Sequence, residues 1–400
     1  MRRFVDRLGV RLATSGLQAL CIVLIARQVG PSAFGQFALG ISLGVIVGTL
    51  LGFGATTRAL RILREPEPVV MASSLSVYRL GSAAITACAV AGVLVVLGAD
   101  SIVAAAIGIV AAVDHFCDYE QTVRAGFLEH RGSAVVILLQ RGLPAAAVTT
   151  SFLAGWNCIV AYAAAALLVI CLVLVRPVAR FDGRLDLQAV RIGALGYWWG
   201  TVASATQQFD MVLAKASTGL VGTGLYGAAN RLVSPLGLVV NSAVVAFSPS
   251  YGQIEDFEQR HRVFRRFALV ASLFGAVLVL LSPFIAWIVG LVLGAAYVDA
   301  RPIIIGVTAA SGIGAAAQVL QSYMYMEGKA VENARYALSA VVAGLAAMFI
   351  SGLLLGPSWL WTGLFVNYTT LTVLLVFAFR RHSKEMRGPA ERNRDSSKQL

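Results

Sequence analysis

The chain has 400 residues, of which 58% are hydrophobic and 13% are charged, and its mean hydropathy is +0.78. A soluble domain carries about 25% charged residues, so this composition excludes an ordinary soluble globular protein. The net charge of +12 does not indicate a nucleic-acid partner. The basic residues stand in short clusters between long apolar runs, as they do in the cytoplasmic loops of membrane proteins.

Long runs without a charged residue indicate the class of fold; they cover residues 232–254, 302–326 and 336–379. Each exceeds the roughly 20 residues that cross about 30 Å of hydrocarbon. Backbone groups in lipid must bond to one another, which such runs achieve as helices. The sequence therefore predicts an all-α integral membrane protein. In chain order we expect twelve transmembrane helices, at residues 11–29, 34–57, 72–98, 100–124, 132–154, 156–175, 192–216, 222–248, 266–290, 302–326, 334–355 and 359–379.

The links between these spans alternate in charge. The odd-numbered links are short, and their only basic residues are Arg27, Lys215 and Arg301. The even-numbered links, the N-terminus and the tail carry nearly all the other Lys and Arg residues. Because basic residues mark cytoplasmic loops, we expect a multi-pass protein with both termini in the cytoplasm.

The longest charged link, residues 176–191, separates six spans from six. The residues after the last span are polar and mostly charged, which is typical of disorder. We therefore expect four parts: an N-lobe with spans 1–6 at residues 1–177, a cytoplasmic inter-lobe linker at 178–191, a C-lobe with spans 7–12 at 192–380, and a disordered cytoplasmic tail at 381–400.

The two halves also resemble each other in sequence. Residues 23–27 (VLIAR) are similar to residues 211–215 (MVLAK), and a glycine-bearing turn follows each. An aromatic residue and a glycine then open the next span, at 34–35 and 226–227. Six spans in each half make both halves enter the membrane from the same side. This predicts a parallel repeat with any substrate site between the two lobes.

Three segments resemble one transporter family. Residues 26–35 (ARQVGPSAFG) resemble the first hairpin of the polysaccharide flippases, which belong to the multidrug/oligosaccharidyl-lipid/polysaccharide exporter superfamily. Asp210 with residues 224–232 (GLYGAANRL) resembles the start of that family's second half, and residues 325–329 (YMEGK) resemble the end of its tenth helix. The chain has no room for the thirteenth and fourteenth spans of longer relatives.

This resemblance implies two six-helix bundles in a V around a central cavity, in the bacterial cytoplasmic (inner) membrane. It also implies transport of undecaprenyl-diphosphate-linked repeat units for O-antigen, capsule or exopolysaccharide. The implied partners are membrane lipid, the lipid-linked oligosaccharide, a polysaccharide polymerase and other biosynthesis proteins.

Cations inside the spans are the first candidate site residues. An ionisable group at mid-bilayer costs about 2.5–3.5 kcal/mol on insertion scales and usually faces a cavity or a partner. Arg141 and Arg231 lie near the middle of spans 5 and 8, and Arg79 lies a turn or two into span 3. Arginine presents a planar fork that suits a diphosphate. We predict these three as diphosphate-binding residues, with structural pairing, such as Arg141 with Asp118, as the alternative.

Acids inside the spans form a second candidate set. Asp114 and Asp118 are four residues apart and share one face of span 4. Two close carboxylates hold one proton more tightly, so this pair predicts a proton or Na⁺ site or, alternatively, neutralisation of nearby arginines. Asp210 lies in span 7; contact with a sugar, cation binding and pairing with Lys215 all remain open.

No pattern indicates a catalytic residue, a cofactor or a metal. Residues 222–227 (GTGLYG) match the dinucleotide fingerprint, but they lie between apolar helices and not in a strand–helix unit. The five cysteines show no ligand spacing. A polymerase needs a sizeable external loop and a glycosyltransferase needs a soluble domain, and we expect neither. The sequence favours a flippase over a cation-coupled exporter of small molecules, and both over an enzyme.

Span 2 also predicts a packing surface. Gly40, Gly44, Gly48 and Gly52 recur every four residues. Glycines at this spacing form a smooth ridge that lets a second helix approach closely.

Overall fold

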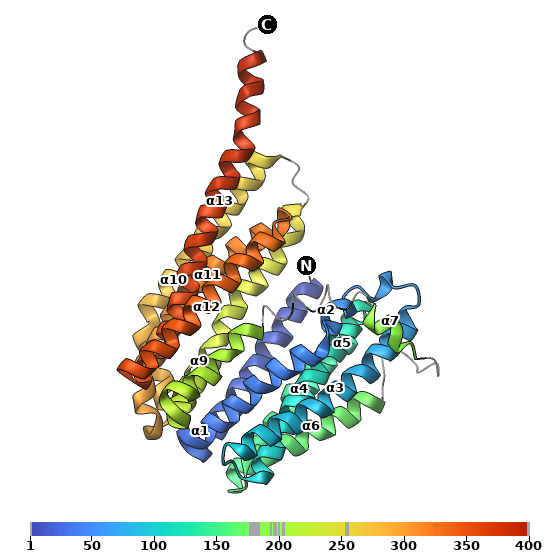
Figure 1. The fold of residues 1–400 in the computed structure, drawn as a ribbon, viewed down its shortest axis with the longest axis vertical. Coiled ribbons are helices and arrows are strands. Elements are labelled where there is room, and N and C mark those ends of the chain that lie inside the picture. The colour runs from blue at the N-terminus through green and yellow to red at the C-terminus, as the bar shows by residue number, and fades with distance from the viewer. Residues whose placement is uncertain are drawn as a thin grey trace.

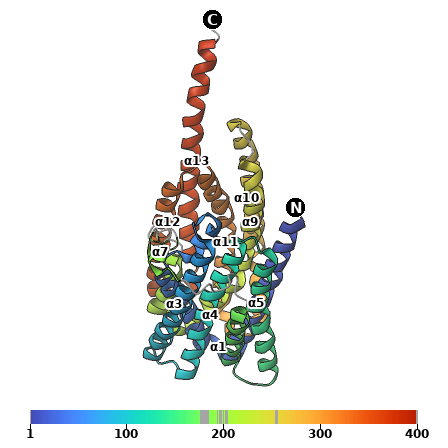
Figure 2. The ribbon, with the colours of Figure 1, turned by 90° about the vertical axis from the view of Figure 1, so that its right-hand side faces the viewer.

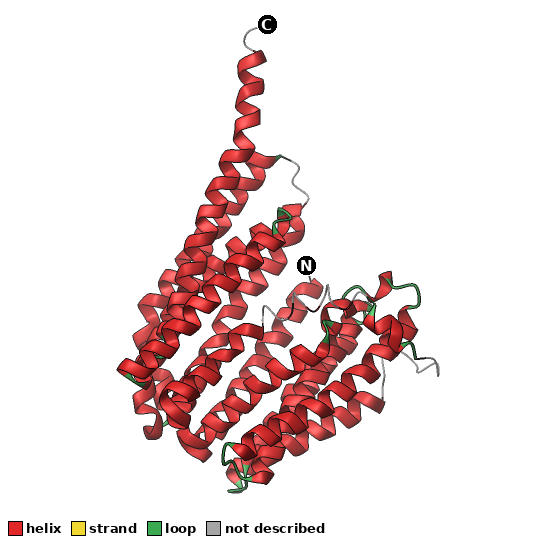
Figure 3. Ribbon diagram, in the orientation of Figure 1, coloured by secondary structure: helices red, strands yellow, loops and turns green. Residues whose placement is uncertain are grey.

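The computed structural model describes residues 2–175, 185–192, 205–252 and 256–397, together with residues 194, 198 and 201. Within these residues the regular elements are all helices (Figure 3). Nine described segments are long and apolar enough to cross a membrane. The prediction of an all-α membrane protein is confirmed.

Two groups of helices make up the molecule (Figure 1). The first group contains α1 (Arg2–Gly52), α2 (Ala55–Ala59), η1 (Ile62–Arg64), α3 (Pro68–Val96), α4 (Ser101–Gly126), α5 (His130–Leu153), α6 (Cys158–Val175) and α7 (Leu187–Arg191). The second contains η2 (Thr206–Gln208), α9 (Phe209–Gly252), α10 (Phe257–Leu293), η3 (Ala295–Ala300), α11 (Arg301–Met326), α12 (Ala330–Leu355), η4 (Pro357–Trp359) and α13 (Thr362–Ser397). We call them the N-lobe and the C-lobe.

Helices α1 and α9 lie side by side where the lobes meet (Figure 1). The remaining long helices of each lobe pack behind them. Both ends of the described chain lie at the same end of the bundle, with the even-numbered links, and the odd-numbered links lie at the opposite end (Figures 1 and 2). This arrangement agrees with an even number of spans.

Helices α1 and α9 each contain two spans joined at a glycine. Gly30 has φ 73° and ψ 174°, and Gly219 has φ 74° and ψ −172°. Positive φ at this ψ is open almost solely to glycine, so both halves use the same device to reverse the chain. The predicted spans 1 and 2 are thus the two arms of α1, and span 8 is the second arm of α9. Most of the first part of predicted span 7 lies outside the described residues.

The ends of α4 and α11 repeat each other in the same way. The amide of Glu129 donates to the Arg124 carbonyl at 2.8 Å, and the amide of Lys329 donates to the Met324 carbonyl at 2.8 Å. The residue before each amide is left-handed, which is the usual way to end a helix. Since α4 is the fourth span and α11 the tenth, the parallel repeat of six spans is confirmed.

A close crossing joins the lobes at the odd-link end. A side chain on Gly35 would overlap the carbonyl of Leu220, and one on Gly224 would overlap the carbonyl of Pro31. These contacts are reciprocal, because the register that aligns Gly30 with Gly219 also aligns Pro31 with Leu220 and Gly35 with Gly224. The sequence comparison had aligned Gly35 with Gly227 instead. That alignment is wrong because it matched the aromatic residues Phe34 and Tyr226 instead of the turn glycines Gly30 and Gly219.

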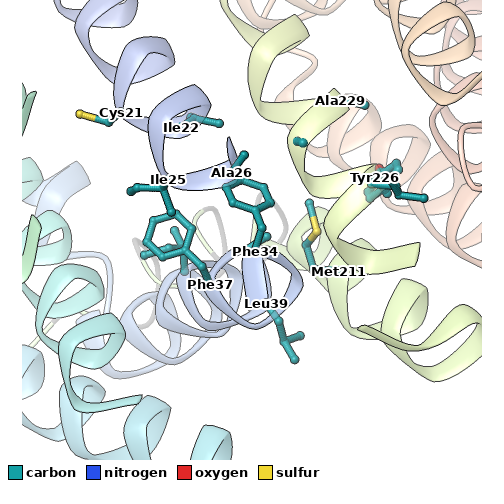
Figure 4. Packing of buried hydrophobic residues seen from close by; sticks show 14 of the residues in the cluster. Cys21, Ile22, Ile25, Ala26, Phe34, Phe37, Leu39, Met211, Tyr226 and Ala229 are labelled. Atoms are coloured by element: carbon teal, nitrogen blue, oxygen red, sulfur yellow. The ribbon is translucent and has the colours of Figure 1, made fainter. Parts of the chain in front are cut away.

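Large apolar side chains close the same end. Phe34 from α1 packs beside Ala26, opposite Met211 and Tyr226 from α9 (Figure 4). The ring of Tyr297 in η3 meets Phe34 edge-on at 6.5 Å. Its hydroxyl donates to the backbone carbonyl of Ala26 at 3.2 Å. The lobes are therefore locked together at the odd-link end by both apolar burial and a hydrogen bond.

The glycine ridge of span 2 packs inside the N-lobe. A side chain on Gly44 would overlap Ala111, and one on Gly48 would overlap the ring of His115. Both partners lie on α4, so the predicted close helix approach is confirmed. Its partner is a helix of the same lobe.

The described part of the predicted linker is anchored to the N-lobe. Arg58 forms a bidentate ion pair with Glu65: its Nε donates to Oε1 at 2.7 Å and its Nη2 donates to Oε2 at 3.0 Å. Its remaining amino group donates to the carbonyls of Val190 and Ile192 at the end of α7, at 3.2 Å each. The guanidinium of Arg58 also holds the pKa of Glu65 below its usual range. Residues 176–184 lie outside the described residues.

The tail differs from expectation. Helix α13 continues to Ser397 and projects beyond the rest of the molecule (Figure 2), where a disordered segment after residue 380 was predicted. Residues 381–387 include Lys, Arg, Glu and Met, which favour helix, so a helix already formed in the membrane extends into the start of the tail.

Candidate functional site

An ion pair between α4 and α5 lies at the centre of the N-lobe site. The Arg141 Nη1 atom donates to both oxygens of Asp114, at 3.1 Å and 3.3 Å. The side chains keep 16% and 23% of their surface exposed. The pair is therefore sheltered, yet still reachable. The sequence named Asp118 as a possible partner of Arg141, and the structure places the ion pair on Asp114.

A glutamine connects the two acids of span 4. The Gln140 amide donates to Asp114 at 2.9 Å and to Asp118 at 3.3 Å. Asp118 also accepts from Gln121 at 2.8 Å, and it is exposed. The two acids share a helix face as predicted, because residues four apart are neighbours on a helix. Sequence reasoning missed Gln140, although an amide next to Arg141 inside an apolar span was a visible signal.

Arg79 occupies a different environment. It is 6% exposed, and its Nη2 atom lies 2.8 Å from His115 Nδ1 and donates to the His115 carbonyl at 3.3 Å. Arginine has no acceptor, so Nδ1 accepts and the imidazole carries its proton on Nε2. Gly52 leaves the space that the guanidinium fills. This geometry favours a packing role within the N-lobe, and the predicted diphosphate contact stays a prediction.

Arg231 reaches from the C-lobe into the N-lobe. Its Nη2 atom donates to the carbonyl of Ala38 on α1 at 3.4 Å. Its buried Nε atom has no hydrogen-bond partner within the described residues. Helix α1 also packs against α5, the helix that carries Arg141. Arg231 therefore lies at the junction of the lobes, and joint binding of a diphosphate by Arg141 and Arg231 stays a prediction.

Asp210 lies in the first turn of α9 in the C-lobe. It is 5% exposed and accepts a hydrogen bond from the Tyr226 hydroxyl at 2.9 Å and from the Asn230 amide at 3.3 Å. The backbone amide of Met211 donates to its other oxygen at 2.6 Å. These partners come from within α9, and they hold the carboxylate in place.

A cavity of about 670 Å³ lies in the C-lobe between α9, α11 and α13. Its lining includes Val244 and Met326, which places the cavity toward the even-link end. Within the described residues its polar lining consists of amides, hydroxyls and phenols: Asn230, Ser234, Ser311, Gln318, Gln321, Ser322, Tyr325 and Tyr368.

Sequence reasoning missed this cavity because it followed charges. The signal was present on span 10, where Gln318, Gln321, Ser322 and Tyr325 recur at spacings of three and four. That spacing places them on one face of a helix. An uncharged polar face on a membrane helix was therefore readable before the structure was known.

No family description and no curated protein matches the chain. Solved structures do match it over nearly its full length. An inward-facing multidrug resistance MATE family transporter of the MOP superfamily aligns with a TM-score of 0.69 and 16% identity, covering 95% of this chain and 99% of that chain. An outward-facing transporter of the same kind aligns with a TM-score of 0.65 and 13% identity, covering 96% of each.

The lipid II flippase MurJ, in an inward closed conformation, also aligns. Its TM-score is 0.71 and its identity 12%, covering 93% of this chain and 86% of that chain. These likenesses establish the fold. The chain is a multi-pass membrane protein with about twelve transmembrane helices, and its fold is similar to the folds of these MATE family transporters and of MurJ.

Proposed function

We propose that this protein is a flippase for oligosaccharide repeat units carried on undecaprenyl diphosphate. It would move them from the inner to the outer leaflet of the bacterial cytoplasmic membrane, with both of its termini in the cytoplasm. Its partners would be membrane lipid, the lipid-linked oligosaccharide, a polymerase and other polysaccharide biosynthesis proteins. The resemblance of residues 26–35 to polysaccharide flippases supports this assignment.

The observation that carries the proposal is that Arg231 of the C-lobe reaches the carbonyl of Ala38 on α1 of the N-lobe at 3.4 Å, and α1 packs against α5, which carries Arg141. A diphosphate carries two negative charges, and two guanidinium forks can bind its oxygens while remaining charged away from water. Arg141 would exchange its bond to Asp114 for the ligand, and the unpartnered Nε of Arg231 would gain an acceptor. Asp114, Asp118 and Asp210 would hold these cations when no ligand is bound.

The direction of transport has a physical rationale. Moving one charge through 100 mV is worth about 2.3 kcal/mol, so an inside-negative potential favours outward movement of an anionic diphosphate. The even-link end would be cytoplasmic by the positive-inside rule. The C-lobe cavity would then face the leaflet in which the substrate is made.

A cation-coupled exporter of small molecules is the second candidate. The MATE fold and the buried carboxylate of Asp210 favour it. Such a protein would bind a cationic or neutral drug, for which two arginines at the lobe junction are unfavourable. It would also respond to an ion gradient in the absence of any lipid-linked sugar.

Proteoliposomes containing a fluorescent undecaprenyl-diphosphate-linked oligosaccharide separate the two candidates. We expect transfer between leaflets, measured as the fraction accessible to an external quencher, to fall at least tenfold in Arg141→Ala and Arg231→Ala. Lysine at either position should restore only part, since a point charge replaces a fork. Arg265→Ala, which alters an exposed arginine of α10, is the matched control. Normal transfer by both alanine variants, or proton-driven efflux of ethidium by the wild type, would contradict the flippase proposal.

A further inference from the structure

The C-lobe cavity has the size of a ligand site and an unusual lining. Its volume of about 670 Å³ falls within the roughly 300–1,000 Å³ typical of small-molecule sites. Among the described residues, no Asp, Glu, Lys, Arg or His contributes to its lining. A cavity whose polar lining groups are uncharged and lie among apolar ones suits a ligand that has hydrogen-bonding groups and carries no net charge.

The polar groups converge from three helices. Gln318, Gln321 and Ser322 project from one face of α11, and Asn230 and Ser234 lie one turn apart on α9. Amides and hydroxyls both donate and accept hydrogen bonds. Sugar hydroxyl groups also do both, so this set can bind several of them at once.

One polar atom in the wall of the cavity has no hydrogen-bond partner among the described residues. The Oε1 atom of Gln318 is buried without a hydrogen-bond donor within the described residues. An unsatisfied buried acceptor is unfavourable. Because Gln318 also lines the cavity, a rotation of its side-chain amide would bring this acceptor to a hydroxyl group of a ligand.

Two aromatic rings supply part of the apolar lining. Tyr325 comes from α11 and Tyr368 from α13. The backbone at Gly314 lies against the ring of Tyr368, whose atoms would be 3.1–3.2 Å from a side chain added there. Glycine thus lets α11 approach and fix this ring. A fixed phenol offers both a flat apolar surface and a polar tip, which matches the mixed surface of a sugar ring.

The cavity is also connected to the diphosphate site through α9. Asn230 lines the cavity, and the next residue, Arg231, reaches α1 at the lobe junction. Neighbouring residues on a helix point about 100° apart. The two side chains thus leave α9 in different directions but at nearly the same height along the helix. A single ligand with a diphosphate at Arg231 can place the adjoining sugar beside Asn230.

We propose that this cavity is a carbohydrate subsite that accepts uncharged sugars of the repeat unit. The inference rests on the proposed flippase function and adds selectivity to it. An acidic sugar would bring a carboxylate into a cavity with no cation to pair with, and burying an unpaired charge is strongly unfavourable. The diphosphate is recognised at Arg141 and Arg231, and the neutral sugars are recognised by α9, α11 and α13.

The test uses the full chain in lipid nanodiscs and saturation-transfer NMR. The neutral probes are maltotriose, mannotriose and tri-N-acetylchitotriose, the acidic probe is trigalacturonate, and farnesyl diphosphate reports the other subsite. We expect saturable binding of at least one neutral trisaccharide, weakened tenfold or more by Gln318→Leu and by Gln321→Leu. Gln259→Leu, at an exposed glutamine of α10, should have no effect. Farnesyl diphosphate binding should survive the glutamine variants, which shows that they are folded.

The carbohydrate subsite is overturned if none of the neutral probes saturates, if trigalacturonate binds as tightly as they do, or if the glutamine variants bind like the wild type. Failure of the proposed function is distinguishable. In that case farnesyl diphosphate would not bind, or would bind independently of Arg141 and Arg231, whatever the trisaccharides do.

Discussion

In the N-lobe the polar groups near the junction are charged, with Asp114 and Arg141 paired at 3.1 Å. The C-lobe also carries charged groups, Asp210 and Arg231, but amides and hydroxyls form the polar lining of its cavity of about 670 Å³. The backbones of the two lobes nevertheless repeat each other at Gly30 and Gly219. The repeated backbone therefore fixes how the lobes pack, while the side chains give each lobe a separate chemistry. A ligand with an anionic end and a neutral end suits this division.

The largest expected difference concerns stability. Asp114→Ala leaves the guanidinium of Arg141 sheltered without its carboxylate, and removing one partner of a buried pair costs about 3–5 kcal/mol. We expect a loss near the lower end, because both side chains keep some exposure. Gln321→Ala removes a group that faces a cavity, and we expect a loss of about 0.5 kcal/mol. Unfolding in detergent, followed by circular dichroism during titration with sodium dodecyl sulfate, measures both.

Asp114→Ala/Arg141→Ala is the control for this comparison. Removing both charges should recover at least half of the stability lost in Asp114→Ala, since no unpaired cation remains. Equal stabilities for Asp114→Ala and Gln321→Ala would show that the charged junction of the N-lobe is no more demanding than the neutral cavity of the C-lobe.

The second prediction compares a methyl group added where the lobes cross with a methyl group added where the helix has no close neighbour. Gly224→Ala places a methyl group against the carbonyl of Pro31, which must push the lobes apart at the odd-link end. Gly92→Ala adds the same methyl group where no atom lies within 4 Å. Spin labels are attached at Ile102→Cys and Val298→Cys in a background without other cysteines. Double electron–electron resonance should then report a longer distance between the two labels in Gly224→Ala, and an unchanged distance in Gly92→Ala.

Both label positions are exposed, at 67% and 51%. An unchanged distance in Gly224→Ala would mean that the crossing does not set the separation of the lobes. A change of similar size in Gly92→Ala would mean that any added methyl group disturbs the bundle.

The sequence predicted much of this architecture because membrane helices follow simple rules. Long apolar runs, basic links and the glycine ridge at Gly44 and Gly48 each have one main physical cause, and the structure confirms the helical spans and the ridge. Contacts between distant residues were harder to predict. Arg141 pairs with Asp114 instead of Asp118, because helix rotation decides which of two acids on one face is nearer, and spacing along one helix does not determine that rotation.

The C-lobe cavity shows a second limit of sequence reasoning. Arg79 was predicted as a site residue because a cation in a membrane span is energetically costly, yet it packs against His115 inside one lobe. Gln318 and Gln321 were not predicted as site residues, because placing an uncharged amide in the membrane costs less free energy than placing a cation there. The function of such an amide depends on the empty space beside it. That space arises from three helices together and has no counterpart in any single segment of the sequence.

The smallest expected effect compares the same turn in the two lobes. After α4 the left-handed residue is Leu128, with φ 63°, and after α11 it is Gly328, with φ 73°. This conformation costs a residue with a side chain about 1–2 kcal/mol, and Leu128 is 67% exposed, so little packing offsets the strain. Leu128→Gly should therefore stabilise the protein by about 0.5–1 kcal/mol, and Gly328→Leu should destabilise it by about 1 kcal/mol. The same unfolding titration measures both variants. If Leu128→Gly and Gly328→Leu shift the free energy of unfolding in the same direction, the two turns are not equivalent. The structural repeat of the two lobes would then include the helices but not these turns.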